Sequence, residues 1–244
     1  MIAVEPVGNV AVVRLDRAEK RNALTPKMLA ALRGAVDRAT AADCIVLSGV
    51  GGVFCAGFDL KLCKGDAGVL PEMLRGLSAC IAALRDSPCP VVVSAHGAAV
   101  AGGCALLAAA DVVVTNAGAR IGYPVVVLGI SPAVNTPFLR TLIGDGPARK
   151  RSLDPGLISG TDALRIGLAH ECMAEAGQCE GRAMELGQQL AAKPRHALRA
   201  TREWLRTLAP IDHAAEALNA SLSLCGGEEE AALLAALWAK ESVE

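Results

Sequence analysis

The sequence predicts an α/β domain followed by a helical C-terminal segment. Short apolar runs bounded by Gly, Pro or Ser alternate with stretches of helical spacing as far as Thr136, and from Pro137 onward the strand signals thin out. A chain of 244 residues is also long enough to bury a sizeable core. We expect the α/β core to span residues 1–190 and the helical, oligomerising segment to span residues 191–244.

The composition argues against several classes of protein. Hydrophobic residues make up 52% of the chain but only six residues are aromatic, so Ala, Val and Leu must build the core. The 24 basic and 25 acidic residues are interleaved, which favours neither a nucleic-acid surface nor a membrane-binding basic face. The nine Cys lack the spacing of metal ligands and predict reduced, buried thiols rather than a metal site. No apolar run reaches the roughly 18 residues of a membrane span, and the first residues lack the basic start of a signal peptide, so a cytoplasmic protein is expected.

The first 40 residues predict a hairpin and a helix. Residues 2–7 and 10–15 are short runs rich in β-branched side chains, separated by a Gly-Asn pair typical of tight antiparallel turns. Thr25 followed by Pro26 is typical of a helix start, and apolar residues three and four apart continue to about Thr40. This helix should cover one face of the sheet.

A strand followed by a glycine-containing loop comes next. Residues 44–47 are a short apolar run that predicts a buried strand. In the loop that follows, Ala56 and Gly57 carry almost no side chain, so a ligand can approach the backbone N–H groups closely. Asp59 is placed to cap a following helix. The loop therefore suits an anion or an oxyanion, although a tight turn packed by its two Phe residues fits these positions equally well.

A second stretch repeats this plan. Residues 91–93 form another apolar run, His96-Gly97 predicts a turn, and Ala101-Gly102-Gly103 opens a helix of small residues that ends near Asp111. Two strands are therefore expected to present one open loop each.

Pro, Gly and apolar spacing predict the remaining segments. Residues 62–69 predict a mobile polar loop, and a helix is expected from Pro71 to Ser87. A buried strand is expected at residues 111–115, and a β-rich segment at residues 121–129 should form the walls of a site. Later helices are expected at residues 138–143, 161–168, 181–192, 194–208, 211–224 and 228–238.

Four motifs along the chain carry a resemblance to a known family. Residues 54–60, Phe-Cys-Ala-Gly-Phe-Asp-Leu, resemble the FxAGxDL signature of the enoyl-CoA hydratase/isomerase (crotonase) superfamily. Residues 101–105 resemble its GGGCE segment, residues 15–24 its LNRPEKRNAL segment and residues 162–169 its EAxxxGLV segment. Each match alone is weak, but together they cover most of the chain in the order of the family.

The resemblance implies a fold and a ligand. The fold of this family is a spiral of β-β-α units, with C-terminal helices that assemble a homotrimer, often paired into a hexamer. The ligand is an acyl-CoA thioester, which carries coenzyme A as part of the substrate and implies no other cofactor. Two backbone N–H groups hold the thioester carbonyl in the family, and the matches assign them to Phe58 and Gly102. One such donor is typically worth about 2.7–4 kcal/mol of transition-state stabilisation.

The resemblance also implies which further residues contact the substrate. Lys20 and Arg21 would meet the phosphates of coenzyme A, whereas composition alone would leave them in a solvated loop. The bulk of Phe58 is expected to narrow the acyl channel. The other substrate-binding positions are Ala23, Ala56, Asp59, Leu60 and Val125.

The two acidic residues that the family's hydratases use are missing. The matches place Ala105 and Val125 at these positions, and no Asp or Glu lies between Asp111 and Asp145. A carboxylate pair is needed to activate water and to move a proton at the α-carbon, and neither Ala nor Val can carry a proton. The sequence therefore argues against ordinary hydratase activity, and Val125 also argues against the single-Glu isomerase reaction.

Other polar residues near these motifs are candidate proton carriers. Tyr123 is the only Tyr and is a candidate catalytic hydrogen-bond donor, although packing is the simpler interpretation. His96 fits a packed residue better than a base, and Asn135 and Thr136 are polar without being good bases. The family's halide-displacing relatives use an Asp nucleophile in the segment where this chain has Ser131-Pro132-Ala133.

We therefore expect an acyl-CoA-binding protein of enoyl-CoA hydratase/isomerase type, a lyase or isomerase of fatty acid metabolism that stabilises a thioester enolate. The alternatives are an enolate-dependent decarboxylase or C–C lyase, a non-catalytic acyl-CoA binder and a structural trimer. Near the C-terminus four residues predict an apolar strip for assembly, unless that helix folds back on its own domain. They are Leu233, Leu234, Leu237 and Trp238.

Overall fold

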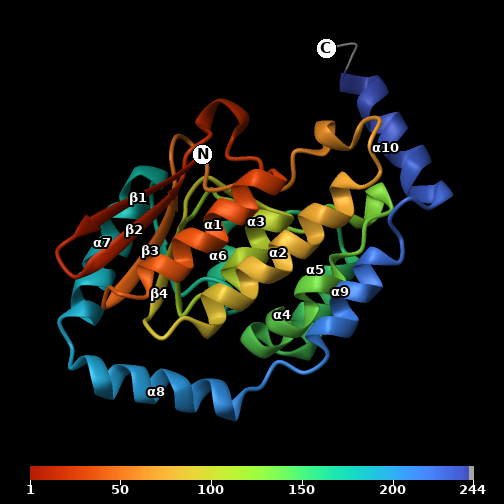
Figure 1. Ribbon diagram of the computed structural model, residues 1–244. Helices are drawn as coiled ribbons and strands as arrows, with labels where there is room; N and C mark the ends of the chain where they lie inside the picture. The colour runs from red at the N-terminus through yellow and green to blue at the C-terminus, as the bar shows by residue number, and fades with distance from the viewer. Residues whose placement is uncertain (242–244) are drawn as a thin grey trace.

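A six-stranded sheet lies at the centre of the fold (Figure 1). The computed structural model describes residues 1–241. The strands of the sheet are β1 (Ile2–Val7), β2 (Val10–Leu15), β3 (Cys44–Gly49), β4 (Val91–Ala95), β6 (Val112–Asn116) and β8 (Glu171–Met173). They lie in the order β1-β2-β3-β4-β6-β8, with β1 and β2 antiparallel and every later pair parallel. The hairpin predicted for residues 2–15 is confirmed.

A second, smaller sheet pairs β5 (Ala98–Val100) with β7 (Arg120–Gly122) in parallel. Each of its strands follows directly on a strand of the large sheet, since β5 comes after β4 and β7 after β6. The chain therefore leaves the large sheet twice at the same edge, at the carboxyl ends of the parallel strands β4 and β6. This arrangement carries the two predicted loops to one place.

Helices cover both faces of the large sheet. The helices of the described residues are α1 (Pro26–Ala39), α2 (Val69–Asp86), α3 (Gly102–Leu107), α4 (Thr136–Ile143), α5 (Asp145–Leu153), α6 (Gly160–Arg165), α7 (Cys179–Ala191), α8 (Arg195–Leu208), α9 (Ala214–Leu222) and α10 (Glu228–Glu241). Thr25 caps α1 by accepting a hydrogen bond from the Met28 N–H at 3.1 Å, as its sequence predicts. None of the helices among the described residues combines the length and hydropathy needed to cross a membrane.

Alternate residues of the buried strands build two separate cores. Val13, Leu47 and Val93 belong to the large core, which α1 and α2 complete. Val12 and Val46 belong to a smaller core on the opposite face, where α7 packs. This period of two is the pattern of strands buried on both faces.

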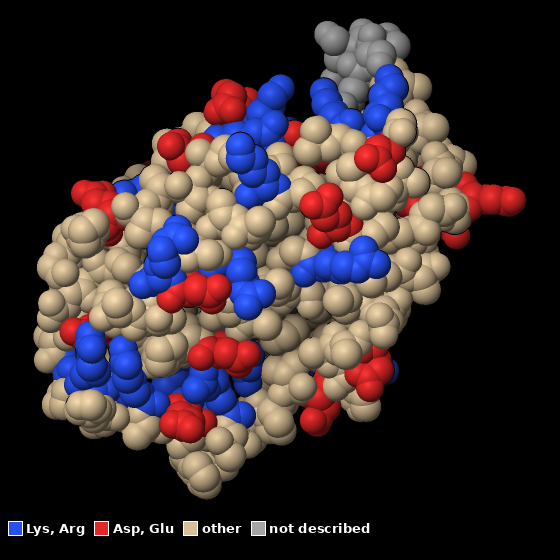
Figure 2. All heavy atoms as spheres, in the orientation of Figure 1, with Lys and Arg blue, Asp and Glu red and all other residues tan. Residues whose placement is uncertain are grey.

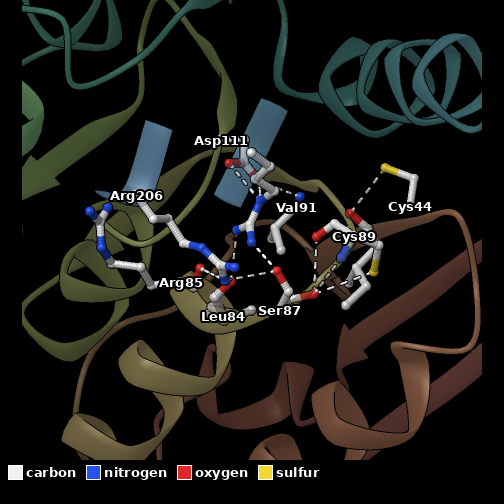
Figure 3. Close-up of polar contacts among 10 residues, drawn as sticks. Cys44, Leu84, Arg85, Ser87, Cys89, Val91, Asp111 and Arg206 are labelled. Atoms are coloured by element: carbon white, nitrogen blue, oxygen red, sulfur yellow. Dashed lines mark hydrogen bonds and ion pairs between the residues drawn. The ribbon is translucent and has the colours of Figure 1, made fainter. Parts of the chain in front are cut away.

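Helix α8 lies along the outside of the core and is held there by several arginines, of which Arg202 is buried. Arg202 Nε donates to both carboxylate oxygens of Asp111, at 2.9 and 2.8 Å, and Nη1 donates to the Ser87 carbonyl. Asp111 also accepts from the Val91 N–H at 2.7 Å, and Figure 3 shows Asp111, Val91 and Ser87 close together. The helical C-terminal segment is thereby fixed to the α/β core.

The apolar strip expected at the C-terminus is not left uncovered. Leu234 is only 3% exposed within the large core, and Leu237 and Trp238 pack against that core. Helix α10 therefore folds back over its own domain, which buries Leu234 and leaves Leu233, Leu237 and Trp238 half-buried. The exposed apolar face of the C-terminal segment lies instead on α8.

Other boundaries also differ from the predictions. Helix α2 begins at Val69, two residues before Pro71, because Pro is compatible with the first turn of a helix. Only residues 121–122 of the predicted β-rich segment pair as a strand, in β7, and a 3-10 turn at Val126–Leu128 follows. Strand β8 and helix α5 were not expected. Acidic and basic side chains are interspersed on the face shown in Figure 2, as their interleaving along the sequence predicts.

Candidate active site

The two predicted loops lie side by side. The Phe54 N–H donates to the His96 carbonyl at 2.9 Å, and the Cys55 N–H donates to the Ala98 carbonyl at 3.0 Å. The Val100 N–H returns a hydrogen bond of 3.0 Å to the Cys55 carbonyl. These bonds fix the loop after β3 against β5, so the glycines of both loops meet.

Among the described residues, two backbone N–H groups have no hydrogen-bond acceptor where the loops meet. Leu24 pairs with the first loop, since its N–H donates to the Gly57 carbonyl at 2.7 Å and its carbonyl accepts from the Asp59 N–H at 2.9 Å. Within residues 1–241, neither the N–H of Phe58 nor that of Gly102 donates a hydrogen bond. Gly102 is the first residue of α3, where an N–H has no partner inside the helix. Both donors are therefore available to an incoming oxygen.

The backbone at this point tolerates little side-chain bulk. Gly57 has φ 95°, in the region that favours glycine, and Ala101 adopts φ 50° although it carries a Cβ. A Cβ on Gly103 would lie 2.7 Å from Cys55 Cβ, which is closer than real side chains approach. Small residues are thus required for the two loops to come together.

An apolar pocket opens beside the two donors. Its empty volume is about 670 Å³, and none of its lining residues in the described chain is charged. A Cβ on Gly102 would lie 3.2 Å from Phe58 Cε1, so the Phe58 ring packs against Gly102 at the pocket's edge. The lining residues are Ala56, Phe58, Leu60, Leu74, Leu77, Ala101, Gly102, Ala105, Tyr123, Pro124, Val125, Leu128, Ile130, Ser131, Pro132, Val134 and Asn135.

A more polar groove adjoins this pocket and has an empty volume of about 1180 Å³. The pocket and the groove share Ala56, Phe58 and Leu60, so they form one continuous path past the two donors. Six of the seven predicted substrate-binding positions line the groove, and the seventh, Val125, lines the apolar pocket. The groove residues are Arg17, Glu19, Lys20, Arg21, Ala23, Ala56, Phe58, Asp59, Leu60, Lys61, Leu62, Leu237 and Trp238.

Asp59 does not cap a helix, contrary to the sequence prediction. The 3-10 turn Leu60–Cys63 follows it directly, but the Asp59 side chain makes no cap hydrogen bond. It pairs instead with Arg17, whose Nη1 lies 2.8 Å from Asp59 Oδ2. The short turn offers few free N–H groups, whereas the guanidinium offers a full opposite charge.

Asn22 is a positioning residue that the sequence reading missed. It is fully buried, and its Nδ2 contacts the carbonyl oxygens of Val50, Val53 and Phe54 at 2.9–3.1 Å. Its Oδ1 accepts from the Arg17 N–H at 2.9 Å. The loop that carries Lys20 and Arg21 is therefore tied to the loop that carries Phe58. The available signal in the sequence was an Asn, which tolerates the left-handed region, inside a charged segment, and the structure gives it φ 56°.

Comparison with known proteins decides the family. A model of the enoyl-CoA hydratase/isomerase family matches residues 5–227. Over 215 residues the chain is 34% identical to a Thermus thermophilus relative named for enoyl-CoA hydratase, with 85% of this chain and 84% of that protein covered. The chain belongs to the enoyl-CoA hydratase/isomerase family. The predicted crotonase superfamily is thereby confirmed.

Solved structures of this family share the fold. An enoyl-CoA hydratase from Mycobacterium smegmatis has a TM-score of 0.83 at 27% identity, over 96% of this chain and 87% of that one. An enoyl-CoA hydratase/isomerase from Mycobacterium paratuberculosis has a TM-score of 0.87 at 24% identity, over 96% and 97% of the two chains. The crotonase-like α/β fold is therefore confirmed.

Tyr123 is a neutral group in the wall of the apolar pocket. It is only 2% exposed, and Asn135 Nδ2 donates to its hydroxyl at 2.6 Å. Burial raises the pKa of Tyr123 well above its ordinary value, and burial likewise raises the pKa of the neighbouring Cys104 to about 12. Neither group is a base near neutral pH, so the predicted role of Tyr123 is limited to hydrogen bonding.

His96 lies outside the apolar pocket. Its ring lines a separate surface hollow with Arg14 and Glu180, and Nε2 lies 3.1 Å from the Gly51 carbonyl. The packed role predicted for this residue fits that position. Seven of the nine cysteines are buried, in keeping with the expected core thiols, whereas Cys172 and Cys225 are half-buried.

Proposed function

We propose that this member of the enoyl-CoA hydratase/isomerase family binds an acyl-CoA thioester and stabilises its enolate without hydrating an enoyl group at an ordinary rate. The observation that carries the proposal concerns residues 1–241, where the N–H groups of Phe58 and Gly102 are unused at the edge of a pocket that no carboxylate of these residues lines. Two such donors stabilise negative charge on the thioester oxygen as the enolate forms.

The groove and the pocket divide the ligand between them. Lys20 and Arg21 line the polar groove, where they would pair with the phosphates of coenzyme A. The acyl chain would occupy the apolar pocket, which Val125 and Ala105 line. The thioester then falls at the shared residues, beside Phe58, where the two donors lie.

The same arrangement limits the chemistry. Addition of water needs one group to remove a proton and another to supply one, and the apolar pocket offers Ala105 and Val125 at the positions that resemble the family's two Glu residues. A reaction in which a bond of the substrate itself breaks and leaves its electrons on the α-carbon needs chiefly enolate stabilisation. Decarboxylation or retro-aldol cleavage of an acyl-CoA fits this site, and non-catalytic binding is the remaining alternative.

Calorimetry with butyryl-CoA and crotonyl-CoA tests the proposal. We expect both to bind wild-type protein and Gly102→Val to lose most of this affinity, because a Cβ on Gly102 lies 3.2 Å from both Leu24 Cδ1 and Phe58 Cε1. Gly146→Val is the matched control, since a Cβ at Gly146 has nothing within 4 Å. Absence of binding by folded wild-type protein would refute the proposal.

We further propose that the helical C-terminal segment assembles the protein as a homotrimer or hexamer. Helix α8 supports this role because it presents three large apolar side chains that the chain leaves open. Trp204 is 61% exposed, Leu205 59% and Leu208 62%. A contiguous apolar face of this kind marks an interaction surface in a soluble protein.

A further inference from the structure

The two oxyanion donors stand at the ends of different loops. Phe58 ends the first loop, residues 50–58, which leaves β3, and Gly102 ends the second loop, residues 96–102, which leaves β4. Both N–H groups must point at one oxygen to stabilise it. Their common aim therefore depends on how the two loops are held against each other.

Two buried side chains hold the carbonyl groups of the first loop. Asn22 Nδ2 contacts the carbonyl oxygens of three of its residues, and His96 Nε2 lies 3.1 Å from a fourth, that of Gly51. Because a carbonyl oxygen can only accept, Nε2 carries the hydrogen of this bond. The His96 residue is only 7% exposed, and Nδ1 has no partner among the described residues. The one hydrogen bond that the ring makes within the described chain thus holds the first loop.

The backbone of His96 joins the same two loops. Its carbonyl accepts from the Phe54 N–H at 2.9 Å. A Cβ on the next residue, Gly97, would overlap the Gly52 carbonyl, so the two backbones are in contact here. The Gly97 N–H donates to Asn116 Oδ1 at 2.8 Å, which anchors this turn to β6. His96 thus lies where the first loop is fixed to the second loop and the second loop to the large sheet.

The geometry points to His96 as a positioning residue, whose ring fixes the first loop against the second and so aims the Phe58 N–H at the same point as the Gly102 N–H. This inference rests on the proposed function, since it concerns the donors that hold the thioester oxygen. His96 acts through the loop rather than on the ligand, because it lines a hollow outside the apolar pocket and the polar groove. Within residues 1–241 no backbone N–H bonds to the Gly51 carbonyl, so the ring supplies the donor there.

The stretching frequency of the ligand carbonyl tests the inference directly. Infrared difference spectra would be recorded with saturating butyryl-CoA that carries carbon-13 at the thioester carbonyl. Wild-type protein should lower this frequency relative to the free ligand in water, because two aligned donors polarise the carbonyl. His96→Leu removes the ring's donor, so the bound ligand should keep at most about half of the wild-type shift. Since every site is occupied at saturation, a loss of affinity alone does not reduce this shift.

Calorimetry separates the thioester from the rest of the ligand. The affinity of His96→Leu for butyryl-CoA should fall about tenfold, which corresponds to one weakened hydrogen bond. Its affinity for free coenzyme A, which has no thioester carbonyl, should stay within about twofold of wild type. A general loosening of the site would weaken the binding of both ligands alike.

Three further variants assign the effect to the ring's donor. His96→Gln ends in an amide N–H group that can donate to the Gly51 carbonyl and should restore most of the frequency shift. His96→Phe also lacks the donor and takes the place of His96→Leu if that variant does not fold. Thr115→Val is the matched control, because Thr115 is fully buried and its Oγ1 donates to the Ala95 carbonyl at 2.8 Å, outside both loops. It should cost comparable stability in urea denaturation and keep the full shift.

The possible failures can be told apart. A full frequency shift in folded His96→Leu or His96→Phe overturns the inference and leaves the proposed function standing. So does an equal loss of the shift in Thr115→Val or in His96→Gln, because the ring's donor is then not the cause. Failure of wild-type protein to bind butyryl-CoA, or binding without any frequency shift, overturns the inference together with the proposed function.

Discussion

Arg17 and Asp59 join the loop before α1 to the loop that carries the oxyanion donor Phe58, with Nη1 and Oδ2 2.8 Å apart. Both side chains are largely buried, at 19% and 13% exposed. Arg17 Nη1 also donates to the Ala23 carbonyl at 3.0 Å. Because Asp59 directly follows Phe58, this ion pair holds the backbone at the point where the Phe58 N–H must be aimed.

Replacing Arg17 should therefore weaken both binding and stability. Hydrogen bonds to charged groups are typically worth about 1.5–3 kcal/mol, so Arg17→Met should lower the free energy of unfolding by about that amount and reduce acyl-CoA affinity. Urea denaturation and calorimetry measure the two effects. Arg33→Met is the matched control, since Arg33 and Asp37 are over half exposed and such pairs contribute about 0–1 kcal/mol. Equal effects of the two substitutions would contradict the prediction.

The local elements of this fold were predictable because their signals are local. The capped start of α1 at Thr25, the hairpin of residues 2–15 and the glycines of both loops are each encoded within a few residues. The meeting of the loops was not predictable from periodicity. It depends on hydrogen bonds such as that from Cys55 to Ala98, which join residues 43 positions apart in the sequence. Only the ordered motifs of the family pointed to it.

The missed features depend on tertiary contacts. Asp59 has the sequence context of a cap, but the guanidinium of Arg17 competes for its carboxylate. The sequence of the apolar strip around Leu234 is the same whether the strip packs against a neighbouring subunit or against its own domain. In the structure it packs against its own domain. The sequence marks Asn135 only as a polar residue that is a poor base, and only the fold shows that its side chain bonds to Tyr123 in the pocket wall.

Ala101 is strained and its replacement by Gly should stabilise the protein. Its φ of 50° and ψ of −114° are unfavourable for a residue with a Cβ, and such conformations cost about 1–3 kcal/mol. Gly loses more conformational entropy than Ala on folding, which costs roughly 0.5–1 kcal/mol. Relief of the strain outweighs this cost, so Ala101→Gly should raise the free energy of unfolding, measured by urea denaturation, by about 1 kcal/mol. Ala99→Gly, in the adjoining strand and without a positive φ, should instead destabilise. A loss of stability in Ala101→Gly would show that the strain is absent.

Buried thiols should make the protein sensitive to alkali. Burial raises the pKa of Cys44, Cys55, Cys80 and Cys104 to about 12, whereas a thiol in an unfolded chain titrates near about 8.5. Between these values the unfolded chain releases protons that the folded chain retains, so the free energy of unfolding falls as pH rises. The stabilisation is complete below about pH 8.5 and is lost progressively toward about pH 12.

Urea denaturation in reducing buffer at several pH values from neutral to alkaline measures this loss. Each thiol contributes a slope of up to about 1.4 kcal/mol per pH unit. Cys80→Ala should lose one such contribution, while its cavity cost is independent of pH. Identical slopes for wild type and Cys80→Ala would contradict the assignment.

The apolar face of α8 should control assembly. Trp204→Glu combined with Leu208→Glu places two charges on side chains that are about 60% exposed, so the subunit should keep its fold while losing its partners. Light scattering at several concentrations measures the mass. Leu153→Glu is the matched control, because Leu153 is 70% exposed on α5, away from this face. An unchanged mass in the double variant would exclude α8 from the interface.

The rate of crotonyl-CoA hydration distinguishes the proposed enolate-stabilising site from an ordinary hydratase site. General acid and base groups contribute typically about 10²–10⁴-fold each, so a pocket with Ala105 and Val125 at both positions should hydrate slower than an ordinary hydratase by several orders of magnitude. Loss of the absorbance of the conjugated enoyl thioester reports the rate. Ala105→Glu combined with Val125→Glu should raise that rate, since each new carboxylate would stand in the pocket wall beside the two oxyanion donors. Val127→Glu, at a residue 55% exposed outside the pocket, should not. Rapid turnover by wild-type protein would show that another group moves the protons.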